Sequence, residues 1–540
     1  MKERPILRNK AYLYMTEFFS GVAVMAVELG ASRLLAPYFS SSQIVWTIII
    51  GTIMIAMALG NLYGGRTADR DPDPDRLYRR ILIAAVWIAL IPVVGKYVIL
   101  GVSALLIFTV STNFLVVAAF AACMVLFVFP LFLLGTVTPC LVKYITDSLE
   151  DNGRVVGNLE AFNTIGSILG TFLPTFVTIP AVGTSVTFLL FSGILLALSA
   201  VYFLSGRVKR GPCAVAAAVF VLCAVFGHSD SFAFWEDDLL YEGESIYNYL
   251  QVKETEDSVI LSTNVLFGVQ SIMQKDGGLT GMYYDTALAA PLMAGVQDKD
   301  DFDILVLGMG SGTYATQCEA FFNSAGTRDM RIEGVEIDQT ITDLARTYFE
   351  LPEDVSVATY DGRAYLQAVD KQYDVIMVDA YQDITIPFQM STVEFFTEVA
   401  DHLKEGGVMV VNMNMHSDGD GSINAHLSDT IASVFPSVYT ADVPGTTNRE
   451  LFAWKDGDAL AVLRDGISQT EPAALRQLME DISAERLQAY EPGDLLLTDD
   501  RAPVELLGIQ VIDRLIQDEV GYYRGIYEEE GLQGLLDRLL

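Results

Sequence analysis

Glycines and carboxylic acids follow four apolar segments in the second half of the chain, at spacings that would let one nucleoside contact them all. The segments are residues 303–312, 333–338, 360–363 and 373–379. The residues in them that could contact the ligand are Gly308, Gly310, Ser311, Gly312, Glu336, Asp361, Gly362 and Asp379. Glycine suits such a site because a side chain at that place would collide with the ligand.

Each acid has its own expected role. Glu336 comes about two dozen residues after the glycines, where a carboxylate can accept hydrogen bonds from both ribose hydroxyls. Asp361 follows the β-rich stretch 355–359 and is expected to take the adenine amino group. Asp379 ends the most apolar segment of the set, so its carboxylate should face the crevice above a sheet. A single acid at the end of a strand often only caps the next helix. The prediction of nucleoside binding therefore depends on the occurrence of all four segments in this order.

The elements that hold these residues are predicted from hydrophobic periodicity. Residues 296–460 alternate apolar strands with helical stretches, which predicts an α/β Rossmann-like domain of the class I methyltransferase type, the doubly wound fold that binds S-adenosyl compounds. Residues 240–295 carry period-two stretches separated by turn residues, which predicts a small antiparallel β-subdomain. Helical patterns in residues 461–540 predict a C-terminal helical extension.

The first 230 residues are expected to form a multi-span α-helical membrane domain. They hold 16 Lys and Arg against 12 Asp and Glu, whereas the rest of the chain holds 18 against 56. About seven apolar stretches approach or exceed the ~20 residues that cross a bilayer. These stretches lie near 11–36, 44–63, 81–109, 114–141, 161–181, 185–205 and 212–228.

The charge distribution does not directly give the side of the membrane on which the soluble domain lies. Lys and Arg cluster at 2–10, 66–80, 143–154 and 207–210, which the positive-inside rule places in the cytoplasm. Seven spans would then put the acidic part outside. Either the last stretch does not cross, or a long stretch is broken, or that part is external. We expect a multi-pass protein of the cell membrane with its soluble domain on the cytoplasmic face.

Composition excludes several classes of partner. Four scattered His and five Cys without zinc-ligand spacing predict no metal site and no disulfide framework. An acidic part with a net charge near −38 would repel nucleic acid and attract polycations.

The soluble part resembles spermidine synthase and its relatives, the polyamine aminopropyltransferases. The resemblance runs over roughly 243–420 and includes Tyr283-Tyr284-Asp285 before the nucleoside-binding fold. The membrane part resembles the amino-terminal half of membrane-fused spermidine synthases. The stretches that carry this second resemblance are 27–33, 58–70 and 163–167, together with the closing motif at 498–505. Most of the chain is thus covered.

This resemblance implies transfer of an aminopropyl group from decarboxylated S-adenosylmethionine, a co-substrate, to a di- or polyamine such as putrescine, giving spermidine and methylthioadenosine. No cofactor would be bound permanently. Asp379 would act as general base or as the anchor of the attacking nitrogen, with the Tyr283 hydroxyl bonded nearby. Asp285 and Asp383 would contact the amine, although both could equally be solvated loop acids. The expected partners are the two small molecules, the lipid bilayer and a second copy of the chain in a homodimer.

Two departures keep alternatives open. Ser311 stands where the family has an acid that anchors the donor ammonium, and Asp383 comes four positions after Asp379 where soluble relatives place an acid at the third. A glycine turn without the acid fits an S-adenosylmethionine methyltransferase equally well. A second alternative is a transporter or sensor whose soluble domain binds nucleoside or polyamine without catalysis, since seven spans exceed what anchoring requires.

Overall fold

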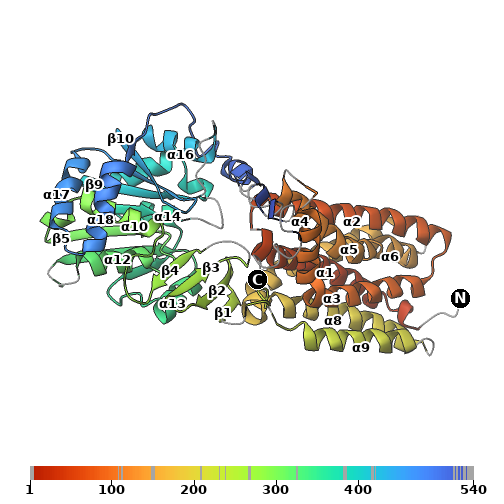
Figure 1. The fold of residues 1–540 in the computed structure, drawn as a ribbon. Coiled ribbons are helices and arrows are strands. Elements are labelled where there is room, and N and C mark those ends of the chain that lie inside the picture. The colour runs from red at the N-terminus through yellow and green to blue at the C-terminus, as the bar shows by residue number, and fades with distance from the viewer. Residues whose placement is uncertain are drawn as a thin grey trace. The chain divides into compact units, whose positions relative to one another are not determined.

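A computed structural model of the 540-residue chain shows two compact units, Met1–Trp235 with Tyr522–Leu540, and Glu236–Gly521 (Figure 1). The residues that it describes are 5–39, 41–107, 109–110, 113–146, 152–206, 210–229, 231–236, 239–265, 269–323, 326, 328–380, 386–414, 419, 421–511, 513–514, 517, 521–522, 525–526 and 531.

The first unit is built from helices. They are α1 (Lys10–Phe39), α2 (Gln43–Arg70), α3 (Pro74–Leu106), α4 (Phe114–Leu126), α5 (Val128–Gly135), α6 (Val137–Ile145), α7 (Asn152–Leu173), α8 (Ile179–Ser205) and α9 (Arg210–Phe226). A short 3₁₀ helix, Pro5–Arg8, precedes α1, and a π-helical turn, Pro174–Thr178, joins α7 to α8. In the described part of the chain, five helical stretches are long and apolar enough to cross a membrane, and Phe114–Leu126 and Gly211–Phe226 are shorter apolar helices.

The difference between about seven expected spans and five long helices arises in two places, one of which is the stretch expected at 212–228, since Gly211–Phe226 is a shorter apolar helix. The stretches expected at 161–181 and 185–205 belong to a single helical run, Asn152–Ser205, of 54 residues. A straight helix of that length would measure about 80 Å, far more than the ~30 Å hydrocarbon core. Gly183 interrupts the run with non-helical angles, φ 79 and ψ 172, so the run is kinked there.

Small residues bring α1 and α7 into close contact. A Cβ on Gly166 would lie 2.1 Å from the Phe18 carbonyl oxygen, and one on Gly170 would lie 2.3 Å from the Val22 carbonyl oxygen. A buried acid on α1, Glu17, is bonded to two other helices, because its Oε1 accepts hydrogen bonds from the Thr138 hydroxyl of α6 at 2.6 Å and the Asn163 amide of α7 at 2.8 Å. Apolar helices packed through glycine are typical of membrane bundles.

The second unit holds two sheets. The first is antiparallel, in the order β1-β2-β3-β4, and is the small β-subdomain that the alternating pattern predicted. Its strands are β1 (Leu239–Glu244), β2 (Tyr249–Glu254), β3 (Ser258–Ser262) and β4 (Ser271–Gln274).

The second sheet has eight strands in the order β12-β10-β11-β9-β8-β5-β6-β7. The pairs from β9 to β7 are parallel, whereas β11 joins β9 in the antiparallel sense. Its strands are β5 (Asp301–Leu307), β6 (Asp329–Glu336), β7 (Ser356–Thr359), β8 (Tyr373–Val378), β9 (Leu403–Met413), β10 (Ser437–Asp442), β11 (Arg449–Trp454) and β12 (Gln488–Ala489). This arrangement confirms the predicted Rossmann-like fold class.

Helices cover both faces of this sheet, so its central strands are apolar on both sides. The helices are α10 (Tyr283–Ala287), α11 (Ala289–Met293), α12 (Thr313–Phe322), α13 (Gln339–Tyr348), α14 (Gly362–Ala368), α15 (Val393–Asp401), α16 (Ile423–Ala432), α17 (Ala459–Gln469) and α18 (Ala473–Asp481). The chain leaves β5 toward β6 on one side and returns to β8 on the other. Ligands bind at such a reversal of strand order, beyond the carboxyl ends of the strands.

Candidate active site

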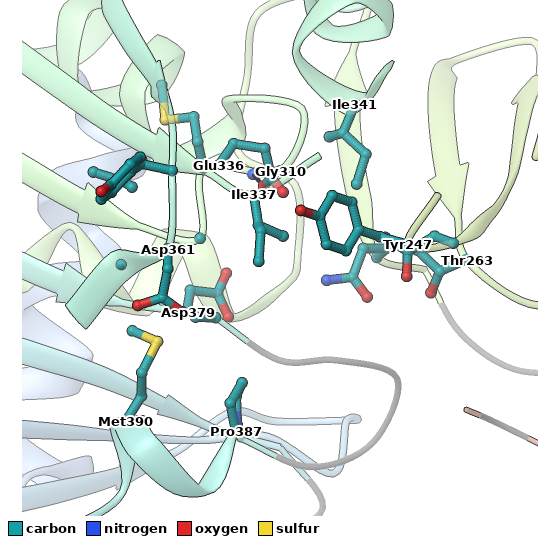
Figure 2. A pocket seen from close by; sticks show the side chains of 18 of the residues that line it. Tyr247, Thr263, Gly310, Glu336, Ile337, Ile341, Asp361, Asp379, Pro387 and Met390 are labelled. Carbon is teal, nitrogen blue, oxygen red and sulfur yellow. Dashed lines mark hydrogen bonds between the residues drawn. The ribbon is translucent and has the colours of Figure 1, made fainter. Parts of the chain in front are cut away.

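A cavity of about 240 Å³ lies at this reversal, within the second unit. Glu336, Asp361 and Asp379 line it from the ends of β6, β7 and β8, while Tyr247 and Thr263 line it from the β-subdomain (Figure 2). Among the described residues that line the cavity there is no Lys, Arg or His. The wall therefore carries acids without basic partners, which suits a positively charged ligand.

The glycine turn after β5 brings backbone to the cavity. Gly308 has φ +86, and a Cβ there would lie 2.4 Å from the Asp379 backbone oxygen. Gly310, with φ +54, donates its N–H to the Glu336 Oε2 at 3.0 Å. Both glycines line the cavity, as expected for residues that a ligand approaches closely.

Ser311 and Gly312 have other neighbours and are not among the described residues that line this cavity. The Ser311 N–H donates to the Ser271 hydroxyl at 3.1 Å, and its own hydroxyl lies 3.3 Å from that of Thr313. A Cβ on Gly312 would lie 2.4 Å from a methyl carbon of Leu351. These two residues thus join the turn to the β-subdomain and to the protein interior, and the ligand contacts expected of them stay predictions.

Glu336 is held by backbone donors. Its Oε2 accepts from Gly310, and its Oε1 accepts from the Asp338 N–H at 3.1 Å. Burial raises the pKa of Glu336 to about 7, although these two hydrogen bonds act in the opposite direction. The carboxyl is therefore fixed in orientation before any ligand arrives.

Asp361 and Gly362 line the cavity at the start of α14. The Asp361 Oδ1 accepts a hydrogen bond from the Ala364 N–H at 2.9 Å, which caps that helix. Asp361 can therefore cap α14 and also bind a ligand, because the cap uses one carboxyl oxygen and the residue still borders the cavity.

Asp379 receives two side-chain hydrogen bonds. The Tyr283 hydroxyl donates to its Oδ2 at 2.6 Å, and the Asn412 amide donates to its Oδ1 at 2.9 Å. The Asn448 amide in turn donates to the Asn412 Oδ1 at 2.9 Å. Burial raises the pKa of Asp379 to about 7 despite both bonds, and burial next to Asp379 raises the pKa of Tyr283 well above its ordinary value. Tyr283 therefore stays a donor at neutral pH.

Sequence reasoning paired Tyr283 with Asp379 but missed the two asparagines. Asn412 follows the apolar stretch 408–411 on β9, in the same way that Asp379 follows the apolar residues of β8. A polar side chain that ends a buried parallel strand was therefore an available signal. Asn448 precedes β11 and carries no comparable pattern.

The two acids expected beside the amine have different outcomes. Asp285 is buried, and its Oδ1 accepts from the Thr280 N–H and hydroxyl and from the Gln317 amide at 2.7 to 2.9 Å. Its Oδ2 accepts from the Gly281 N–H at 2.6 Å. Asp285 thus holds the turn before α10, and its contact with the amine stays a prediction. Asp383 lies outside the described residues.

The raised pKa values predict how stability changes with pH. A carboxyl whose pKa is higher in the folded than in the unfolded protein stabilises the fold fully at low pH, and this contribution is lost as pH rises through the folded pKa, about 7 for Asp379. Between about pH 4 and about pH 7 the ligand-free protein should lose stability, and Asp379→Asn should lose less, by an amount on the order of a few kcal/mol. Thermal unfolding in detergent at several pH values measures both slopes, and parallel slopes would contradict the raised pKa.

Residues 286–450 match the family model described as "Spermine/spermidine synthase domain". A "Probable polyamine aminopropyl transferase" of Bifidobacterium longum is 55% identical over 352 residues, which cover 62% of this chain and 77% of that protein. A "Polyamine aminopropyltransferase" of Vibrio vulnificus is 26% identical over 223 residues, covering 39% of this chain and 70% of that protein.

Among solved structures, a probable spermidine synthase from Corynebacterium glutamicum aligns with 21% identity and a TM-score of 0.36, over 47% of this chain and 96% of its own. The family assignment rests on the proteins that are similar in sequence, not on this structural alignment. Since the match at 55% identity spans 77% of a curated relative, and the family model falls on the domain that holds the acidic cavity, the chain belongs to the polyamine aminopropyltransferase family of enzymes.

Proposed function

We propose that this enzyme transfers an aminopropyl group from decarboxylated S-adenosylmethionine to a di- or polyamine such as putrescine, giving spermidine and methylthioadenosine. The observation that carries the proposal is the position of Asp379. Its carboxylate borders an acidic cavity, is oriented by Tyr283 and Asn412, and has a pKa of about 7. A base with a pKa near the working pH is well matched to proton transfer.

The reaction breaks one bond and forms another. The amine nitrogen attacks the CH₂ group next to the sulfonium sulfur, the C–N bond forms, and the C–S electron pair stays on sulfur to give a neutral thioether. The attacking nitrogen must lose a proton, which Asp379 would accept. The donor sulfonium and the amines are cationic, which agrees with a wall whose described residues include three acids and no base.

The nucleoside would bind on the β6 and β7 side of the cavity. In this proposal Glu336 accepts hydrogen bonds from the ribose hydroxyls, and the free oxygen of Asp361 takes the adenine amino group. Gly308 and Gly310 leave room for the backbone to approach the ligand, since both have left-handed φ values and border the cavity.

One experiment separates this activity from methyl transfer, with which the hydroxyl of Ser311 in place of an acid is equally compatible. The purified full-length protein is incubated with either intact or decarboxylated S-adenosylmethionine and a panel of diamines, and products are identified by mass. Aminopropylated amine and methylthioadenosine are expected from the decarboxylated donor alone. Methylated amine would favour a methyltransferase, and nucleoside binding without any turnover would favour a regulatory domain.

We also propose that the enzyme is a multi-pass protein of the cell membrane whose catalytic unit faces the cytoplasm. The support is the set of long apolar helices and the Lys and Arg clusters at 66–80 and 143–154. A reporter that works only in the cytoplasm, fused after Leu540, should be active. Activity only of a reporter that requires the exterior would place the catalytic unit outside.

A further inference from the structure

Glu450 is a buried acid that has no hydrogen-bond partner among the described residues. Its side chain is 0% exposed, and neither carboxyl oxygen has a hydrogen-bond partner within the part of the chain that the structure describes. Buried polar groups in proteins are nearly always hydrogen-bonded, because leaving one unpaired costs about 1–3 kcal/mol or more. A carboxyl that is fully buried and has no donor among the described residues therefore calls for a partner that arrives later.

Its place in the sheet connects Glu450 to the active site. Glu450 on β11 is directly opposite Asn412 on β9 in the antiparallel register, so both side chains point to the same face. Asn412 donates to Asp379, which follows β8, the next strand in the sheet. Acid, amide and acid thus stand in a row across three neighbouring strands. With strands about 4.8 Å apart, the backbones of the two acids are separated by roughly 10 Å.

The surroundings disfavour a charge on Glu450 unless a cation is present. Burial and the negative charge of Asp379 raise the pKa of Glu450 well above its ordinary value. The described titratable groups that interact with these two acids include Tyr283 on α10, which is bonded to Asp379, and Tyr314 on α12, whose pKa Glu450 helps to raise. Glu336 and Tyr284 interact with Asp379 as well. None of these groups supplies a positive charge. An ammonium group is the partner that would balance both acids at once.

Glu450 also lies on the correct side of Asp379 for the second substrate. Asp379 borders the nucleoside cavity, whereas Asn412 and Glu450 are not among its described lining residues. A nucleophile attacks carbon from the side opposite the leaving sulfur, so the amine and the nucleoside must approach the reacting carbon from opposite directions. The row from Asp379 to Glu450 leads away from the nucleoside.

We propose that Glu450 binds the far ammonium group of a diamine acceptor, while Asp379 holds the nitrogen that attacks. The inference rests on the proposed aminopropyl transfer and adds a residue that selects diamines over monoamines. Two nitrogens joined by four carbons are about 6 Å apart when extended, as ordinary bond lengths require. This span fits two side chains that point to one face from strands two positions apart.

The test compares amines as well as variants. In the full-length protein, Glu450→Gln keeps the size of the side chain and removes its charge. The ratio of kcat/KM for 1,4-diaminobutane to that for butylamine should fall by about 10- to 100-fold, the usual loss for a charge-assisted hydrogen bond. The loss should appear in KM for the diamine, with kcat at saturation and methylthioadenosine affinity retained. Glu405→Gln, an exposed acid on the same strand as Asn412, is the matched control and should change nothing.

Other outcomes would overturn the proposal. An unchanged ratio in Glu450→Gln would make Glu450 a merely structural acid. If that variant does not fold, the KM values of the wild-type protein for diamine and monoamine provide the test. Equal values would exclude a second anchor for the diamine. If the wild-type protein transfers nothing to any amine, the proposed function fails instead. Calorimetry in the presence of methylthioadenosine then still compares the affinities for the two amines, and equal affinities would reject the Glu450 anchor by itself.

Discussion

Asp379→Asn is expected to lower the rate of aminopropyl transfer by about 10²- to 10⁴-fold, the usual loss when a general base is removed. The substitution keeps the shape of the side chain and can keep one of the two hydrogen bonds seen at Asp379. It removes the proton acceptor and the negative charge that attracts the amine. Steady-state kinetics with saturating donor measures the loss, and the affinity for methylthioadenosine, measured by calorimetry, should change little.

Glu336→Gln should have the opposite pattern of effects to Asp379→Asn. It should weaken methylthioadenosine binding by about 1–3 kcal/mol and change kcat less than Asp379→Asn does. The two variants together separate binding of the nucleoside from the proton transfer. Near-normal turnover in Asp379→Asn with any amine would reject the role of Asp379. Unchanged nucleoside affinity in Glu336→Gln would remove Glu336 from the ribose site.

Gly308→Ala is expected to destabilise the protein and to abolish nucleoside binding. Gly308 has φ +86, and a Cβ there would lie 2.4 Å from the Asp379 backbone oxygen and 2.6 Å from the Ala380 Cα. Backbone strain and overpacking together should cost roughly 2–5 kcal/mol of unfolding free energy. The displaced backbone carries Asp379, so the site would be distorted as well. Thermal unfolding and methylthioadenosine calorimetry measure the two effects.

A matched control for this change exists on β9. Gly406 also has a left-handed φ, +72, but nothing lies within 4 Å of the position its Cβ would take. Gly406→Ala should therefore show only the conformational cost and keep full nucleoside binding. Equal behaviour of the two variants would mean that the contact with Asp379 is unimportant and that φ alone matters.

The fold class was predictable because its signals are local. The apolar run that breaks at Gly308 and the acids Glu336 and Asp379 at later strand ends are each visible within about ten residues, which is the length over which hydrophobic periodicity operates. The apolar character of the first 230 residues is equally local. The sequence also placed a break between 181 and 185, where Gly183 kinks the helical run, but it did not show that one 54-residue run continues across the break.

Asn412 and Glu450 could not be assigned in the same way. Asn412 is 33 residues from Asp379 in the chain, and the two meet only because β9 lies beside β8 in the sheet. Glu450 has the appearance of an ordinary charged residue in a short strand. Its complete burial depends on helices packed over that face of the sheet, and burial of this kind is a property of the tertiary structure.

Asp285 shows how little the local sequence says about the direction of a side chain. Its place two residues after Tyr283 made it a natural choice for the amine site, since Tyr283 does reach Asp379. Consecutive residues at the start of a short helix point in different directions, however. The carboxylate of Asp285 faces the preceding turn and accepts hydrogen bonds from it.

The antiparallel direction of β11 has a consequence for where active-site residues can come from. Parallel strands bring their last residues to the ligand-binding edge of a sheet, and Glu336 and Asp379 follow that rule. A strand that runs the other way brings its first residues to the same edge, as β11 does with Glu450. In an α/β enzyme whose sheet ends in antiparallel strands, substrate-recognising side chains should therefore be sought where those strands begin, in the hairpin that precedes them. Variation in that hairpin offers a route to new acceptors, and it leaves the nucleoside half of the site unchanged.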